Sequence, residues 1–156
     1  MHTRNQKAGF SLIELIIVVL FLGIAGSAAL LMFKNQEIGS LESEAQGVAT
    51  RVREARGRAF AGVDGLAWGV HFENATTTPF YAIFPGSTYV SASSTVFNLG
   101  TLVRYATLSQ GSSTEILFTK LSGTIATGTS VQFKLATDAS KTKTVSVSAE
   151  GKVSVE

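Results

Sequence analysis

The chain has 156 residues, enough for one domain of ordinary size together with an appendage. It carries 13 lysines and arginines against 11 acidic residues, two histidines and no cysteine. Two of the basic residues, Arg4 and Lys7, precede Gly9, so the chain beyond Gly9 carries 11 charges of each sign. This balance argues against a protein that binds nucleic acid through bulk positive charge. Without cysteine, disulfides, thiolate metal sites and a cysteine nucleophile are excluded.

The N-terminal part of the sequence contains an uncharged, apolar run of 19 residues at positions 15–33. At a rise of about 1.5 Å per residue, such a helix comes close to the length that crosses a hydrocarbon core of about 30 Å. The run therefore predicts a membrane helix, with Arg4 and Lys7 on the cytoplasmic side and the rest of the chain beyond the membrane. A secretory signal peptide cleaved after the run is the alternative. The length of the run and the small residues inside it argue against that alternative.

Glu14 is the residue that does not fit a plain membrane anchor, because it stands between apolar residues on both sides. An acidic side chain near the middle of a bilayer costs about 2.5 to 3.5 kcal/mol, so an intramembrane carboxylate is a functional hypothesis. We expect a positively charged group to pair with Glu14. The alternative is a shallow position at the membrane interface, where the carboxylate stays hydrated.

Residues 9–15, with the sequence GFSLIEL, follow a short basic leader and precede the apolar run. This segment resembles the class III signal of type IV pilins and type II secretion pseudopilins. In that family a prepilin peptidase cleaves after the glycine on the cytoplasmic side and methylates the new N-terminal phenylalanine. The resemblance implies cleavage between Gly9 and Phe10 and an assembly role for Glu14, the fifth residue of the mature chain. Leu31 stands where many major pilins have a helix-kinking proline, which weakens a major-pilin assignment.

After the membrane segment, apolar residues recur at alternating intervals of three and four: Ile38, Leu41, Ala45, Val48, Val52, Ala55 and Ala59. This spacing keeps one face of a helix apolar, and the small alanines allow close approach to a sheet. The helix is predicted to run to about Phe60 and to end near Gly62. The predicted organisation is a cleaved leader at 1–9, a membrane and assembly half of the helix at 10–34, an amphipathic half at 35–62 and a head at 63–156.

Four arginines lie near the end of this helix, at Arg51, Arg53, Arg56 and Arg58. A nucleic-acid patch is one interpretation of such a cluster. At 100° per residue, however, the four side chains fall on both flanks of the apolar face, and Glu54 is placed to pair with Arg58. A solvated helix surface is therefore the favoured interpretation.

Beyond Gly65 the pattern becomes alternating, with Trp68, Val70 and Phe72 on one side of a strand and Gly69, His71 and Glu73 on the other. We expect His71 to point to solvent or to a sheet edge. Further strands are predicted at 80–84, 99–106, 115–120, 130–136, 142–148 and 152–156. Turn residues separate them, and Glu150 and Gly151 are expected to close a final hairpin.

The end of the helix at 52–61, VREARGRAFA, and the strands that follow it resemble the GspH/FimT group of minor pseudopilins. In that group an alanine- and arginine-rich helix end leads into two antiparallel sheets, and a glycine turn precedes the last strand. The predicted fold class is α+β and pilin-like, with a long N-terminal helix packed against an antiparallel, β-rich head.

The sequence holds no phosphate-binding loop, no metal-ligand spacing and no nucleophile elbow. We therefore predict no enzyme, no cofactor, no metal site and no catalytic residue. The resemblance implies a minor pilin or pseudopilin of a type II secretion pseudopilus or a type IV pilus. A DNA-binding minor pilin of a DNA-uptake pilus is the alternative, and Lys141, Lys143 and Lys152 would give it only a thin basic surface.

The same resemblance implies the partners and the location of the protein. The partners are a prepilin peptidase, other pilin or pseudopilin subunits, an inner-membrane assembly platform and membrane lipid, whereas DNA is possible but not favoured. The chain is expected to cross the inner membrane once, with its N-terminus in the cytoplasm and its head outside, before it is assembled into a filament.

Overall fold

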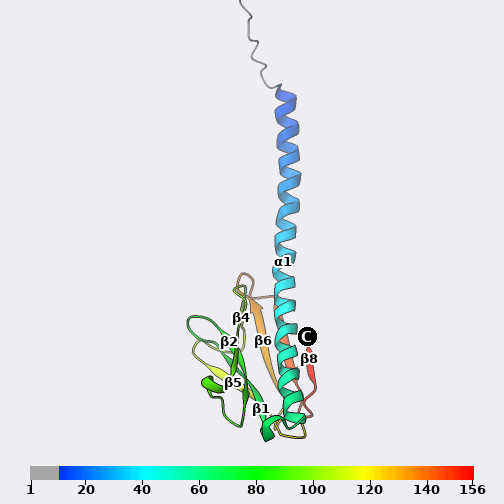
Figure 1. Ribbon diagram of the computed structural model, residues 1–156. Helices are drawn as coiled ribbons and strands as arrows, with labels where there is room; N and C mark the ends of the chain where they lie inside the picture. The colour runs from blue at the N-terminus through cyan, green and yellow to red at the C-terminus, as the bar shows by residue number, and fades with distance from the viewer. Residues whose placement is uncertain (1–10) are drawn as a thin grey trace, which may run out of the picture. The chain divides into compact units, whose positions relative to one another are not determined.

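The structure, a computed structural model, describes residues 11–156 and, within the first helix, only the backbone of residues 25–36. The basic leader and the Gly9–Phe10 junction lie outside the described residues. The chain divides into two compact units, Met1–Gln36 and Glu37–Glu156. Helix α1 (Leu12–Phe60) contributes to both units (Figure 1).

The part of α1 that belongs to the second unit buries one continuous face. Its buried side chains are Leu41, Ala45, Val48, Ala49, Val52, Ala55 and Ala59. The predicted apolar face is thus confirmed from Leu41 onward, and Ala49 joins it. Ile38, also predicted to lie on this face, is 41% exposed.

The helix ends at Phe60, as predicted, because the chain enters a left-handed turn. Gly62 has φ 63° and ψ 33°, a conformation that glycine adopts without a Cβ penalty and that commonly terminates helices. A second segment completes this end, since the backbone N–H of Leu121 donates to the carbonyl of Ala59 at 2.9 Å. The short 3-10 turn η1 (Val63–Gly65) then leads into the first strand.

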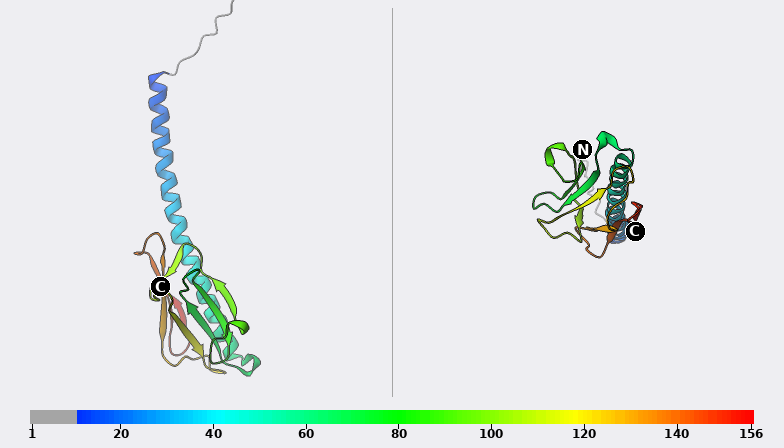
Figure 2. Two further views of the ribbon diagram at one scale, coloured as in Figure 1. Left: turned by 90° about the vertical axis from the view of Figure 1, so that its left-hand side faces the viewer. Right: turned by 90° about the horizontal axis from the view of Figure 1, so that it is seen from below.

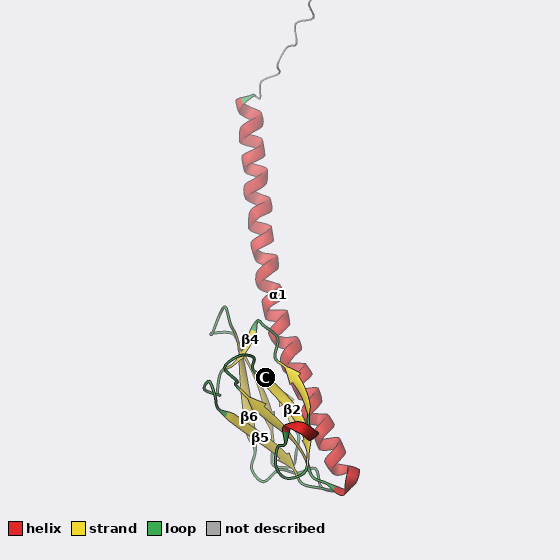
Figure 3. Cartoon of the chain, turned by 60° about the vertical axis from the view of Figure 1, so that its left-hand side comes forward, coloured by secondary structure: helices red, strands yellow, loops and turns green. Residues whose placement is uncertain are grey.

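Eight strands form two antiparallel sheets of four strands each. Sheet A has the order β3-β2-β1-β5, with β1 (Trp68–Glu73), β2 (Phe80–Pro85), β3 (Thr95–Asn98) and β5 (Ser113–Phe118). Sheet B has the order β4-β6-β7-β8, with β4 (Val103–Tyr105), β6 (Thr129–Leu135), β7 (Thr142–Val147) and β8 (Val153–Val155). Figures 2 and 3 show both sheets beside the C-terminal half of α1.

The sequence pattern missed one strand and overextended another. Strand β3 is a short edge strand of largely exposed residues, so it carries little of the apolar alternation by which strands are recognised. The strand predicted at 99–106 shortens to β4, because the backbone N–H of Val103 bonds back to the carbonyl of Gly100 and forms a turn before the strand. The 3-10 turn η2 (Ser91–Ser93) lies between β2 and β3.

One hydrophobic core fills the space between the two sheets and the helix. Sheet A contributes Phe72 and Phe118, sheet B contributes Phe133 and Val145, and α1 contributes the buried face that begins at Leu41. All buried residues of this core lie within the unit Glu37–Glu156. The second half of α1 and the two sheets, together called the head from here on, therefore carry a complete core of their own.

Deleting residues 1–35 should release a soluble, monomeric and folded head, because the core remains whole while the exposed apolar side chains of the first half of α1 are removed. Size-exclusion chromatography and circular dichroism of the fragment 36–156 check this expectation. The full chain without detergent is the control and should aggregate. A folded fragment that still aggregates would contradict the expectation and would reveal an uncovered interface on the head.

Candidate functional site

Apart from Glu14, the described side chains in the first half of α1, residues 12–24, are apolar on all sides of the helix. The large ones between Leu12 and Ile24 are 46–76% exposed in the single chain. A helix that is apolar all round is stable only where protein or lipid covers it, so this surface is the candidate assembly site. Within the described residues, no helix is both long and apolar enough to cross a membrane. The predicted membrane half, 10–34, includes residues outside that described set.

Glu14 lies in the first turn of α1, and its side chain is exposed. The backbone N–H groups of Glu14 and Leu15 both donate to the carbonyl of Ser11, at 3.0 and 3.2 Å, so the helix begins directly after Ser11. A carboxylate in the first turn is stabilised by the positive end of the helix dipole. The assembly role of Glu14 stays a prediction, and the other two predicted site residues, Gly9 and Phe10, lie outside the described residues.

At the other end of α1, Arg56 joins the helix to both sheets. Its Nε donates to the carbonyl of Gly123 at 3.2 Å, and a terminal nitrogen of its guanidinium donates to the carbonyl of Glu150 at 3.1 Å. Gly123 follows the end of β5 in sheet A, whereas Glu150 lies in the turn between β7 and β8 of sheet B. The predicted final hairpin is confirmed, and its turn is part of this three-way junction.

Gly151 is required at this junction by its conformation and by its surroundings. It has φ +80°, and a Cβ added there would collide with the carbonyl oxygen of Gly123 and with the side chain of Arg56. The two turns therefore approach each other closely only because position 151 has no side chain.

Gly151→Ala should lower the free energy of unfolding of the head. The left-handed backbone conformation alone costs a residue with a Cβ about 1–2 kcal/mol, and we expect the loss to exceed that cost clearly. The matched control is Gly111→Ala, because Gly111 has φ +79° and open space around the added Cβ. Urea denaturation of both variants measures the difference, which isolates the collision with Gly123 and Arg56. Equal losses in the two variants would contradict the close approach of the turns.

Arg51 and Arg58 pack onto aromatic side chains of sheet A, whereas Arg53 is exposed. Glu54 bonds Arg51 at 2.9 Å and Arg58 at 2.6 Å, which confirms the predicted Glu54–Arg58 pair. The guanidinium of Arg51 lies 4.4 Å from the ring centroid of Phe97, and that of Arg58 lies 4.7 Å from the ring of Trp68. The hydrogen bond from Arg51 is the main cause that lowers the pKa of Glu54. The predicted solvated surface is therefore wrong in part, because cation–π contacts cover one side of these guanidinium groups.

Lys143, one of the three lysines considered for DNA binding, is paired within the head. Its Nζ lies 2.7 Å from a carboxylate oxygen of Glu42 on α1, and this bond is the main cause that lowers the pKa of Glu42. Lys141 and Lys152 are exposed. The predicted basic surface is thus thinner than the sequence indicates.

Glu44, two residues further along α1, has the opposite environment. Partial burial raises its pKa, and a hydrogen bond with the backbone of Gly100 opposes that rise. A carboxyl whose pKa is raised by folding stabilises the head below its unfolded pKa, and this contribution is lost as the pH rises through the folded pKa. Glu42 has the reverse linkage, because its contribution is present above its unfolded pKa and is lost as the pH falls through its folded pKa.

Glu44→Gln should therefore raise the Tm of the head at pH 7, and the gain should shrink as the pH approaches the ordinary pKa of glutamate, about 4.3. Glu42→Gln is the matched control and should lower the Tm at pH 7, because the pair with Lys143 is lost. Thermal denaturation of both variants between pH 4 and pH 7 checks the two signs. A Tm loss at pH 7 in Glu44→Gln would contradict the assigned direction.

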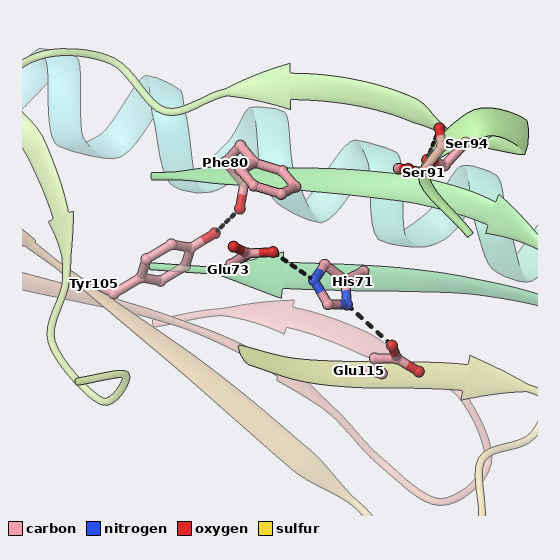
Figure 4. Close-up of polar contacts among 7 residues, drawn as sticks. All are labelled: His71, Glu73, Phe80, Ser91, Ser94, Tyr105 and Glu115. Atoms are coloured by element: carbon pink, nitrogen blue, oxygen red, sulfur yellow. Dashed lines mark hydrogen bonds and ion pairs between the residues drawn. The ribbon is translucent and has the colours of Figure 1, made fainter. Parts of the chain in front are cut away.

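His71 is the residue whose placement the sequence missed. It is 6% exposed and lies on β1, which is flanked by β2 and β5, so the expectation of a solvent or edge position is wrong. Nδ1 lies 3.0 Å from Glu115, Nε2 lies 3.2 Å from Glu73 (Figure 4), and the ring stacks on Tyr89 at 3.9 Å. Tyr89 comes from the segment after β2, and no local sequence signal shows that this segment folds over the strand.

The His71 cluster has two carboxylates on opposite sides of one ring, an arrangement that satisfies the polar atoms of a buried side chain. Within the described part of the chain, no group of three or more histidine or acidic side chains is placed to hold a metal ion. The cluster therefore secures the segment that carries Tyr89 to the outer face of sheet A.

One long helix packed against two antiparallel sheets defines the pilin fold, and the predicted fold class is confirmed. Among solved structures, the chain is similar to the type IV minor pilin FimU of Pseudomonas aeruginosa, with a TM-score of 0.54 and 18% sequence identity. The similarity covers 74% of this chain and 92% of the FimU chain. No family model and no curated protein sequence matches the chain.

Proposed function

We propose that this protein is a minor pilin or pseudopilin, a structural subunit of a type IV pilus or of a type II secretion pseudopilus. The observation that carries the proposal is the contrast between the two halves of one helix. The second half is buried beneath the sheets along the face that includes Val48 and Val52, whereas the described apolar side chains of the first half, from Leu12 to Ile24, are exposed. The pilin-like signal at residues 9–15 overlaps the start of that first half. A filament of such subunits would cover the exposed half with the helices of neighbouring subunits.

In this proposal the leader is removed between Gly9 and Phe10, and a prepilin peptidase methylates the new N-terminus. The apolar half of α1 then holds the subunit in the inner membrane, with the head outside, until the assembly platform adds it to the filament. The pilin fold of the head supports the family resemblance of the N-terminal signal. We further propose that the chain belongs to the GspH/FimT group, which residues 52–61 and the strands after them resemble. The subunits that co-purify with the chain would identify the type of filament.

Glu14 is proposed to pair with the positive N-terminal amine of Phe10 in a neighbouring subunit. An ion pair is strengthened where water is excluded, and either charge left unpaired there is costly. The pair would therefore favour one axial step between neighbouring subunits over others. Cleavage does not require this pair, because the junction that the peptidase recognises lies before Phe10.

Glu14→Ala should be inserted into the membrane and processed but recruited poorly into filaments, because the amine of the neighbouring subunit loses its partner. Mass spectrometry of the extracted protein first establishes cleavage at Gly9 and methylation of Phe10. Cross-linking to partner pilins then measures recruitment. Glu37→Ala, which removes a carboxylate from α1 in the second unit, is the control and should be recruited normally.

Two results would count against the proposal, and they can be told apart. An unprocessed N-terminus at Met1 in a host with an active prepilin peptidase would contradict the pilin assignment as a whole. Normal recruitment of fully processed Glu14→Ala would contradict only the pairing role, and would return Glu14 to the alternative of a hydrated carboxylate at the interface.

A DNA-binding minor pilin is the second candidate, and the observed contacts weaken it. Lys143 already pairs with Glu42, and Arg51 and Arg58 already pair with Glu54. Non-specific binding to DNA needs several cations that can replace the counterions of successive phosphates. The structural role is therefore the better supported of the two.

A further inference from the structure

A polar pocket of about 520 Å³ lies where the two sheets meet, outside the proposed assembly surface. Its walls come from three parts of the head: the connection from β1 to β2, strand β4 with the segment that follows it, and β6. The residues that line it include the hydroxyl or amide side chains of Thr76, Thr77, Thr107 and Gln110, and no acidic residue.

Two cations line this pocket side by side. Arg104 of β4 is the direct cross-strand partner of Lys134 of β6, so both side chains project from the same face of sheet B. Both are half-buried. Like charges directly opposite each other destabilise a sheet. Because the backbone pairing fixes the two positions, the charges can move apart only by bending of the side chains.

Neither cation is neutralised within the described part of the chain. Arg104 donates to the carbonyl of its neighbour Val103 at 2.8 Å, and no described carboxylate forms an ion pair with Arg104 or Lys134. This contrasts with Arg51, Arg58 and Lys143, which pair with glutamates. The head thus keeps two adjacent, uncompensated positive charges in a concave and polar place.

The pocket walls are held in position before any ligand arrives. The side chain of Asn74 donates to the carbonyl of Leu108 at 2.8 Å, and its backbone carbonyl accepts from Gly111 at 2.8 Å. The backbone N–H of Ala106 bonds to the carbonyl of Gln132 at 2.8 Å, which fastens the same segment to β6. Binding would therefore require little ordering of the protein, which favours affinity.

We propose that this pocket binds a carboxylate group of a polypeptide, either an acidic side chain or a chain terminus, between Arg104 and Lys134. Guanidinium and ammonium groups form charge-assisted hydrogen bonds to carboxylate oxygens, and the surrounding hydroxyl and amide groups can complete the contacts. The proposal concerns the head alone, so it holds or fails independently of the filament role.

The composition of the pocket favours a polypeptide over single-stranded nucleic acid. Proteins that hold single strands stack bases on accessible aromatic side chains and follow the backbone with a row of cations. Here the aromatic side chain in the lining is Tyr105, which is 3% exposed and donates its hydroxyl to the carbonyl of Phe80 at 2.7 Å. Two cations at one point suit a single compact anion.

The experiment titrates the isotope-labelled head, residues 36–156, with a short capped glutamate peptide at constant ionic strength and follows the backbone amide signals by NMR. We expect saturable shifts centred on Thr77, Thr107 and Lys134. The double variant Arg104→Gln/Lys134→Gln should bind at least about tenfold more weakly, because two charge-assisted contacts are lost. Lys141→Gln/Lys152→Gln is the control with equal loss of charge and should bind as the unchanged head does.

Three further measurements test the ligand chemistry and the role of the charged pair. Inorganic phosphate and a single-stranded oligonucleotide are titrated in the same way, and tighter binding of either at this pocket would overturn the carboxylate assignment. Equal binding by both double variants would overturn the site. Arg104→Gln alone should leave the head at least as stable to urea, because it removes a like-charge contact, and a marked loss of stability would show that the pair is structural and overturn the proposal.

Discussion

The burial of one face of α1 under two sheets is the contact on which the rest of the head depends. The face from Leu41 to Ala59 is closed off from solvent by strands of both sheets, which meet in one core around it. Because both sheets pack on the same helix, turns that are distant in sequence come together at its end. The junction of Arg56 with Gly123 and Glu150 is a direct result of that packing.

The two halves of α1 differ in what covers their apolar side chains. The half within Glu37–Glu156 buries its apolar face inside its own chain. Its Arg51 and Arg58 contact sheet A, and its Glu42 pairs with Lys143 of sheet B. In the first half, the described side chains from Leu12 to Ile24, apart from Glu14, are apolar and exposed, so only contacts outside the single chain can cover them. This combination of a complete core and an uncovered apolar surface agrees with the proposed role in assembly.

The polar side chains on the outer faces of the two sheets differ in whether they have partners within the head. On sheet A, His71 is covered by Tyr89 and bonded to two carboxylates, so it has no capacity left for a ligand. On sheet B, Arg104 and Lys134 stand together without a carboxylate partner in the described head. This difference separates a contact that stabilises the fold from one that is placed for binding.

The sequence by itself determined the features that depend on neighbouring residues: the helix up to Phe60, its buried face from Leu41, the Glu54–Arg58 pair and the final hairpin. Periodicity and turn chemistry act over a few residues, so they can be read along the chain. Only the tertiary structure decided the burial of His71, the edge strand β3 and the pairing of Arg104 with Lys134. Each of these depends on which strands become neighbours and on which segment covers them, and these arrangements are set by contacts between residues far apart in the sequence.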